Sequence, residues 1–161
     1  MGAGKSSALA EASDILTARN VAHAALDLDA LGLACLPSAA LNDEVMYRNL
    51  GYFCRNFESA GVCRLLLARA IEDRAEMELC RSVVSASCTV VCRLTASLET
   101  MEQRVRARES GIRQREFVAR VAKLNAILDA ARLHDFTVAN ENRSLTGVAH
   151  EILVKVGWIP G

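Results

Sequence analysis

The stretch Met1-Gly2-Ala3-Gly4-Lys5-Ser6-Ser7 contains the strongest single signal in this sequence. It matches the closing half of the phosphate-binding pattern G-x-x-x-x-G-K-[ST], with Gly4, Lys5 and Ser6 as its last three positions. Glycines let backbone N–H groups approach phosphate oxygens closely. A helix that begins at about Lys5 directs the positive end of its dipole at the same oxygens. A chance Gly-Lys-Ser at the start of a helix is the competing explanation.

Each residue type in this pattern has a defined role. The lysine reaches the β- and γ-phosphates of a nucleotide, and the serine hydroxyl ligates Mg²⁺. We therefore expect Lys5 to be catalytic, Ser6 to be the metal ligand, and ATP and Mg²⁺ to be the cofactors. The predicted nucleotide-binding residues are Gly2, Ala3, Gly4, Lys5, Ser6 and Ser7. The first glycine of the pattern, and the hydrophobic strand that leads into it, would precede Met1.

Helical and strand-like segments alternate behind this stretch. Hydrophobic periodicity predicts helices over 5–19, 42–60, 73–84, 97–109, 114–133 and 144–156. Apolar runs predict strands over 23–29, 62–68, 88–94 and 135–140. Residues 31–41 are predicted to be a loop, followed by an N-cap at Asn42 or Asp43. The alternation predicts an α/β fold with a mostly parallel sheet flanked by helices, in a single domain over 1–161.

Composition narrows the classes of function. Hydrophobic residues make up 52% of the 161 positions, so the chain can build a core. Nineteen basic and 19 acidic residues cancel, and there is one Trp, so we expect no nucleic-acid partner. No apolar run is long enough for a membrane span, and no signal peptide is evident, so we expect a cytoplasmic protein without a membrane partner. The six cysteines are expected to be buried and reduced, because none forms a C-x-x-C pair.

Two aspartates lie at the end of the predicted strand over 23–29. Asp27 and Asp29 lie at the carboxyl end of the strand over 23–29, where parallel α/β sheets bind ligands. One carboxylate could take a proton from an acceptor hydroxyl, and the other could hold a water on magnesium. Which aspartate is the base stays open, and a pair that only caps the next segment is the alternative.

Four segments of the sequence together resemble a known family. The segments Leu26-Asp27-Leu28-Asp29, Arg48-Asn49-Leu50, Ser59-Ala60-Gly61-Val62 and Ile71-Glu72-Asp73-Arg74 are similar to the small P-loop kinases. The layout is closest to adenylylsulfate kinase, and gluconate, shikimate and nucleoside kinases share the general plan. The resemblance implies that Arg48, Asn49 and Arg74 contact the acceptor. The lysine-glycine-leucine-tyrosine segment of adenylylsulfate kinases is absent, so the acceptor is not identified.

The region of that missing segment is rich in arginine. Residues 104–115 resemble the lid of P-loop kinases, with Gly111 as a hinge and Arg104 and Arg108 on one helix face. The resemblance implies that these two arginines neutralise the transferring phosphoryl group. The alternative is a solvated helix face on which Glu99, Glu102 and Glu109 pair with the arginines.

The resemblance also implies a sheet order of 2-3-1-4-5, with the first strand missing from this chain. The missing central strand leaves three alternatives: a start upstream of Met1, which we favour, a sheet that closes up with four strands, or a strand supplied by another chain. The expected function is transfer of the γ-phosphoryl group of ATP to a hydroxyl of a small molecule. A non-catalytic nucleotide-binding module, or a truncated inactive kinase-like domain, is the alternative. The oligomeric state is open, with a homodimer among the options.

Overall fold

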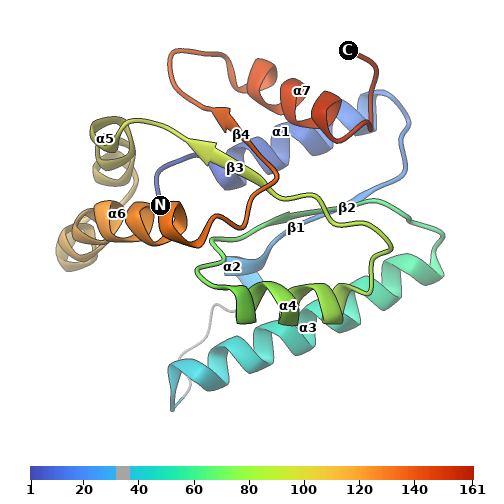
Figure 1. Cartoon of the computed structure of the whole chain (residues 1–161), viewed down its shortest axis with the longest axis horizontal. Helices are drawn as coiled ribbons and strands as arrows, with labels where there is room; N and C mark the ends of the chain where they lie inside the picture. The colour runs from blue at the N-terminus through green and yellow to red at the C-terminus, as the bar shows by residue number, and fades with distance from the viewer. Residues whose placement is uncertain (32–36) are drawn as a thin grey trace.

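The computed structural model describes residues 1–31 and 37–161. Helices and strands alternate along the chain (Figure 1). The helices are α1 (Lys5–Ala18), α2 (Leu28–Leu31), α3 (Ala39–Ser59), α4 (Arg74–Val84), α5 (Leu98–Arg108), α6 (Gly111–Ala131) and α7 (Leu145–Lys155). The strands are β1 (Ala24–Asp27), β2 (Leu65–Ala68), β3 (Cys92–Thr95) and β4 (Phe136–Ala139). All six predicted helices and all four predicted strands are present, so the expected α/β class is confirmed.

The region between β1 and α3 differs from the prediction. The short helix α2 directly follows β1, and α3 begins at Ala39, so both ends of the predicted loop over 31–41 are wrong. Residues 32–36 of that loop lie outside the described residues. The N-cap is Ser38 rather than Asn42 or Asp43, because the Ser38 hydroxyl accepts a hydrogen bond of 3.2 Å from the backbone N–H of Leu41.

Other helix boundaries follow the local chemistry of the sequence. Gly61 and Gly157 lie just beyond α3 and α7 with φ of 81° and 71°, a conformation that glycine adopts without steric cost. Gly111 has φ of 68° and separates α5 from α6 as expected, although α6 begins at Gly111 itself. The Ser144 hydroxyl caps α7 by accepting from the N–H of Gly147 at 3.1 Å.

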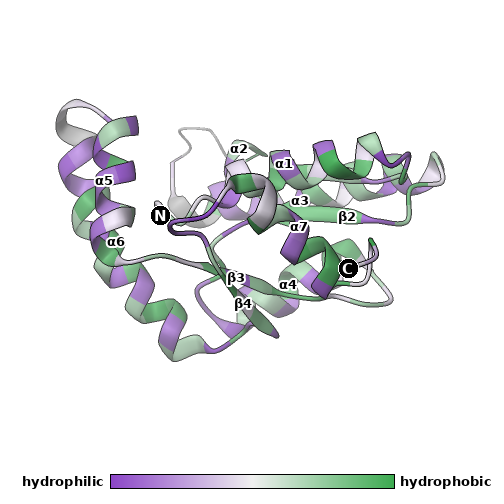
Figure 2. Cartoon of the chain, turned by 90° about the horizontal axis from the view of Figure 1, so that it is seen from above, coloured by the Kyte–Doolittle hydropathy of each residue, from purple (hydrophilic) through white to green (hydrophobic). Residues whose placement is uncertain are grey.

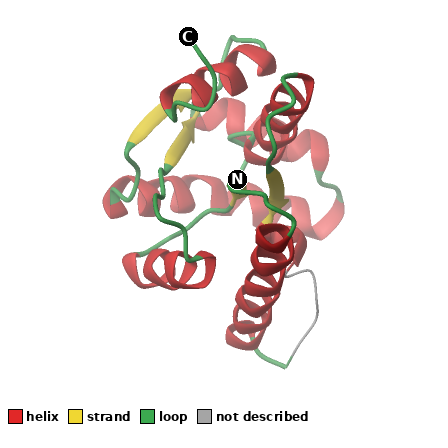
Figure 3. Cartoon of the chain, turned by 90° about the vertical axis from the view of Figure 1, so that its right-hand side faces the viewer, coloured by secondary structure: helices red, strands yellow, loops and turns green. Residues whose placement is uncertain are grey.

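The strands form two separate sheets in the described part of the chain. β1 pairs in parallel with β2, and β3 pairs in parallel with β4. Figure 3 shows the two pairs of strands apart from each other. The expectation of one continuous sheet is therefore wrong, and so is the outcome in which four strands close up. Among the described residues, β2 and β3 are not hydrogen-bonded to each other.

The hydrophobic core is divided in the same way. One cluster joins α1 to α7 through Leu16 and Leu153, and a second joins α2 to α3 through Leu28 and Leu50. A third cluster joins α5 to α6 through Val105 and Val121. Figure 2 shows α5 and α6 on one side of the molecule, with α1, α3 and α7 grouped on the other. Since a compact domain usually has one contiguous core, this division is unusual.

The cysteines only partly follow the prediction of burial. Cys80 is buried and Cys54 and Cys92 are partly buried, whereas Cys63 and Cys88 are exposed, which contradicts the prediction for those two. Cys35 lies outside the described residues. The five described cysteines are free thiols, as expected. Burial raises the pKa of Cys92 to about 11, because the thiolate loses hydration there.

None of the helices in the described ranges is both long enough and apolar enough to cross a bilayer.

Candidate functional site

The segment before α1 has a backbone conformation that depends on its glycines. Gly2 and Gly4 have φ of 74° and 88°, in the region that residues with a Cβ rarely adopt. A Cβ on Gly4 would lie 2.3 Å from the side-chain amide nitrogen of Asn140. A Cβ on Gly2 would lie 2.3 Å from the backbone oxygen of Met101. Both glycines are therefore required by close packing as well as by φ.

The same segment is held from the β3–β4 side of the molecule. The buried amide of Asn140, just after β4, donates a hydrogen bond of 2.8 Å to the backbone oxygen of Ala3. The Arg104 guanidinium, on α5, donates to the backbone oxygens of Gly2 at 3.3 Å and of Asn140 at 2.9 Å. These contacts fix the position of the backbone immediately before α1. Arg104 thus lies at the predicted site, with its charge directed at two carbonyl groups.

The first turn of α1 has free donor groups. Gly4 is the N-cap and has no side chain that could accept from the N–H groups of that turn. The N–H groups at the start of a helix have no partner within the helix and favour an anion. Lys5 and Ser6 are the first two residues of α1. The helix start therefore combines backbone donors, an ammonium group and a hydroxyl in one place.

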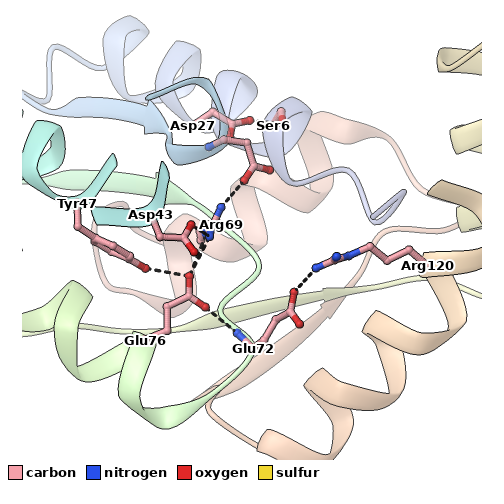
Figure 4. Close-up of polar contacts among 9 residues, drawn as sticks. Ser6, Asp27, Asp43, Tyr47, Arg69, Glu72, Glu76 and Arg120 are labelled. Carbon is pink, nitrogen blue, oxygen red and sulfur yellow. Dashed lines mark hydrogen bonds and ion pairs between the residues drawn. The ribbon is translucent and has the colours of Figure 1, made fainter. Parts of the chain in front are cut away.

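Asp27 contacts this helix start directly. It is the last residue of β1, and one of its carboxylate oxygens accepts a hydrogen bond from the Ser6 hydroxyl (Figure 4). The other oxygen accepts from the backbone N–H of Asp29 at 3.1 Å, which fixes the orientation of the carboxylate. The structure thus brings together two side chains that are 21 positions apart in the sequence.

Arg69 organises the acidic groups beside this contact. It follows β2 and forms ion pairs with Asp29 at 2.9 Å, Glu76 at 3.1 Å and Asp43 at 3.3 Å. Tyr47 donates to the same Glu76 oxygen at 3.0 Å (Figure 4). Burial alone would lower the pKa of Arg69, but the bonds to Asp29 and Glu76 outweigh it and raise the pKa. Burial and the neighbouring Glu76 also raise the pKa of Tyr47.

Sequence reasoning missed Arg69. The available signal was its position as the first charged residue after the apolar run Leu65-Leu66-Leu67-Ala68, at the carboxyl end of a predicted parallel strand. Asp29 was predicted as a site residue, and its pairing with Arg69 partly neutralises the carboxylate. The two aspartates therefore have different surroundings, with Asp27 on Ser6 and Asp29 on Arg69.

Two cavities flank this region. One, of about 100 Å³, is lined by residues of α4, β3, α5 and α6. The other, of about 110 Å³, is lined by residues of α1, β2, β3 and α7. Lys5 and Arg69 line both cavities, so they lie where the two hollows approach each other.

The predicted acceptor-binding residues are not gathered at this site. Arg48 is exposed and forms an ion pair of 2.5 Å with Glu44 on its own helix, and Asn49 and Arg74 are exposed too. None of these three lines either cavity.

Two arginines of the predicted lid have acidic partners. Arg108 pairs with Glu109 at 2.9 Å, and Arg106 pairs with Glu102 at 2.8 Å, which matches the alternative of a solvated helix face. The turn between α5 and α6 is closed by the Gln114 side chain, which donates to the backbone oxygens of Arg106 and Glu109 at 2.9 and 2.8 Å.

The loop after β4 is tied to the start of α5. The Glu141 carboxylate accepts from the Ser97 hydroxyl at 2.6 Å, from the Ser97 N–H at 3.1 Å and from the Thr100 hydroxyl. These hydrogen bonds, those of Ser97 first, lower the pKa of Glu141 because they favour its ionised form. The contacts fix the loop that also positions Asn140.

Neither a scan against models of protein families nor a search of curated proteins yields a match to this chain.

Proposed function

We propose that this protein binds ATP with Mg²⁺ and transfers the γ-phosphoryl group to a hydroxyl of a small molecule. The observation that best supports the proposal is the hydrogen bond between the Ser6 hydroxyl and the Asp27 carboxylate at the start of α1. It joins the two oxygen groups that a magnesium nucleotide requires beside Lys5 and the free N–H groups of the helix.

The donor set of this site suits Mg²⁺. A hydroxyl and a carboxylate are hard oxygen ligands, and Mg²⁺ with a nucleotide usually takes one or two carboxylates, phosphate oxygens and waters. Within the described ranges no group of three His, Cys, Asp or Glu residues is arranged so that it could hold a metal ion by itself, whereas the open kind of site proposed here takes further ligands from the nucleotide and water. Mg²⁺ would neutralise charge on the β- and γ-phosphates when bound with ATP.

The two aspartates have different proposed roles. Asp27, which contacts Ser6, orients the hydroxyl and holds metal-bound water. Asp29, which is paired with Arg69, lies on the side toward α3 and α4 and is the candidate for the acceptor hydroxyl. Lys5 neutralises charge on the phosphoryl group as it moves. In phosphoryl transfer, positioning and charge neutralisation supply most of the rate enhancement.

The strand pairing supports a P-loop kinase plan. In the order 2-3-1-4-5, removal of the first strand leaves the second paired with the third and the fourth paired with the fifth. The observed pair β1–β2 would then correspond to the second and third strands of that plan, and the pair β3–β4 to its fourth and fifth strands. A parallel four-stranded sheet in another order would have argued for a different α/β plan.

The test measures binding and turnover separately. We expect Mg-ATP to raise the thermal midpoint, since a ligand at about 100 times its Kd adds about 2.7 kcal/mol of stability. ADP formation is then followed with adenylylsulfate, sugar acids, shikimate and nucleosides as acceptors. Lys5→Ala should reduce turnover about 100-fold or more. Lys123→Ala, an exposed lysine on α6, is the matched control and should leave turnover unchanged.

The outcomes separate the two candidate functions. ADP formation that depends on Lys5 supports the kinase. A midpoint shift with Mg-ATP that is lost in Lys5→Ala, without ADP from any acceptor, would instead indicate a non-catalytic nucleotide-binding module. No shift at millimolar Mg-ATP would overturn both.

A further inference from the structure

A serine and a histidine outside the proposed nucleotide site form a side-chain pair. The hydroxyl of Ser13, on α1, lies 2.7 Å from Nε2 of His23, the residue that precedes β1. Neither residue lines either of the two cavities. Both side chains are partly exposed, so small solutes can reach them from the solvent.

The second ring nitrogen of His23 decides where the protons of this pair lie. His23 Nδ1 is 2.9 Å from the backbone oxygen of Val21. A carbonyl oxygen can only accept, so Nδ1 carries a hydrogen and donates it. In the neutral ring Nε2 then has a free lone pair, and the Ser13 hydroxyl donates to it. The ring is therefore oriented to take the proton of the serine hydroxyl.

The backbone on both sides of His23 is held in place. Val21 donates from its N–H to the Leu16 oxygen at 2.9 Å, and its side chain packs against the cluster between α1 and α7. Ala24 donates from its N–H to the Arg64 oxygen at 2.9 Å, which fixes the start of β1. A nucleophile within hydrogen-bond reach of a base, with the base oriented by a third group, is the arrangement typical of nucleophilic catalysis.

A serine elsewhere in the fold provides a reference for this arrangement. Ser82 is exposed on α4 and donates to the backbone oxygen of Leu79 at 2.8 Å. In the part of the chain that the structure describes, no serine hydroxyl other than that of Ser13 is hydrogen-bonded to an imidazole. Ser82 thus has the same hydroxyl on a helix, without a base beside it.

A cationic side chain lies next to the pair. His23 and Arg64 directly precede the first register pair of β1 and β2, so they are neighbours on adjacent strands. Side chains alternate between the two faces along a strand, and Leu66 packs toward α1, so Arg64, two residues earlier, lies on that same face. Arg64 is exposed and forms no ion pair within the described ranges. Its guanidinium can therefore turn toward negative charge that develops at Ser13.

We propose that Ser13 and His23 form a second catalytic site, at which Ser13 is the nucleophile in the hydrolysis of small carboxylic esters. The Ser13 oxygen attacks the carbonyl carbon while Nε2 of His23 takes its proton. The bond to the alcohol then breaks, and His23 returns the proton to the leaving oxygen. Water attacks the acyl-serine with help from the same nitrogen, which releases the acid and restores the hydroxyl.

The surroundings define the class of ester. Because the pair lies at the surface and outside the cavities, it fits a short acyl chain on a good leaving group. Arg64 would stabilise the negative charge on the carbonyl oxygen during attack. The proposal does not rest on the nucleotide function and would stand if that function failed.

Two probes test the site, an alkyl fluorophosphonate, which releases fluoride when it labels a serine oxygen, and p-nitrophenyl acetate. Peptide mass spectrometry gives the rate at which each probe modifies each serine. Modification of Ser13 should be about 100-fold or more faster than that of Ser82, because a general base contributes at least this factor. Release of p-nitrophenolate should exceed the protein concentration and fall to background in Ser13→Ala.

Variants of the neighbouring residues separate catalysis from a structural role. His23→Gln should slow modification of Ser13 about 100-fold or more, since an amide keeps a hydrogen bond but cannot take the proton. Arg64→Gln should slow acetylation about tenfold. His134→Gln, at a histidine before β4, is the matched control and should leave both rates unchanged. The thermal midpoint shows that each variant is folded.

Several results would overturn the proposal. Equal rates at Ser13 and Ser82 in the unaltered protein would show that the hydroxyl is not activated, and this comparison decides the question even where His23→Gln does not fold. An unchanged rate in folded His23→Gln would show that the pair only ties α1 to β1. An acetyl group that stays on Ser13 would exclude hydrolysis, and unchanged acetylation in Arg64→Gln would refute the role of Arg64.

Discussion

The β1–β2 and β3–β4 sheets contact the start of α1 in contrasting ways. From the β1–β2 side, Asp27 reaches a side chain, the hydroxyl of Ser6. From the β3–β4 side, Asn140 and Arg104 reach the backbone, the carbonyl groups of Ala3 and Gly2. Contacts to side chains leave those side chains available for exchange with a ligand, whereas contacts to a backbone fix its path. Under the proposed function, the β1–β2 side would supply groups that react and the β3–β4 side would fix the position of the segment before α1.

The largest effect is expected on the chemical side of this comparison. Asp27→Asn should reduce turnover about 100-fold or more, because a neutral amide supplies no charge for Mg²⁺ beside Ser6. The thermal midpoint without ligand should change little, since the contact lies at an exposed position. Steady-state kinetics and the midpoint with and without Mg-ATP measure both quantities. Asp14→Asn, an exposed aspartate on α1, is the charge-matched control, and equal losses in the two variants would refute the role of Asp27.

The next largest effect is expected on the positioning side. Gly4→Ala should lower the free energy of unfolding by about 2–4 kcal/mol, from backbone strain at φ of 88° and from the clash with Asn140. Gly61→Ala is a matched control for the strain alone, because φ is 81° there and nothing lies within 4 Å. Denaturant unfolding gives both values. A cost for Gly4→Ala no larger than that for Gly61→Ala would show that the segment is not packed against Asn140.

A smaller loss of stability is expected for Asn140→Ala. The substitution leaves the Ala3 carbonyl without its 2.8 Å partner in a buried place, at a cost of about 1–3 kcal/mol. Asn56→Ala, at an exposed position on α3, should cost much less. The double variant Gly4→Ala/Asn140→Ala should be more stable than the sum of the single losses predicts, because removal of the amide removes the clash. Strict additivity would contradict the contact.

The smallest effect concerns pH. The bonds from Ser97 and Thr100 lower the pKa of Glu141 below its ordinary 4.5, so its contribution to stability is present above the unfolded value. That contribution is lost as the pH falls through the lower folded value. Glu141→Gln should therefore flatten the decline of stability with acidification below about pH 5. Glu78→Gln, an exposed glutamate on α4, is the control, and identical profiles for the two variants would contradict the assignment.

The elements of the fold followed from local signals. The apolar run at Leu65–Ala68 predicted a strand, and the periodicity over 73–84, 97–109 and 144–156 predicted helices, and the structure contains all of these elements. The short helix α2 was missed, because four residues are too few for a periodic pattern to be visible. The N-cap of α3 was misplaced because Asn42, Asp43 and Ser38 are all good caps, and only the backbone conformation selects Ser38.

Only part of the candidate site was predicted from the sequence. Lys5, Ser6 and Asp27 followed from a motif and from the carboxyl end of a strand, and the structure brings Ser6 and Asp27 together. Arg69 was missed, because its partners Asp29, Asp43 and Glu76 come from three different segments and no spacing in the sequence links them. Arg48 and Arg108 were expected at the site, and in the structure they pair with the neighbouring acids Glu44 and Glu109.

The sequence by itself determined the alternation of helices and strands, the presence of two glycines before α1 and the types of side chain that begin α1. These properties depend on neighbouring residues, so a local pattern is enough to specify them. Only the tertiary structure decided that β2 and β3 stay apart, that the core divides into three clusters, and that Asn140 fixes the backbone at Ala3. Strand pairing and side-chain contacts join residues that are far apart in the chain, so they depend on how the whole chain packs and not on any local pattern.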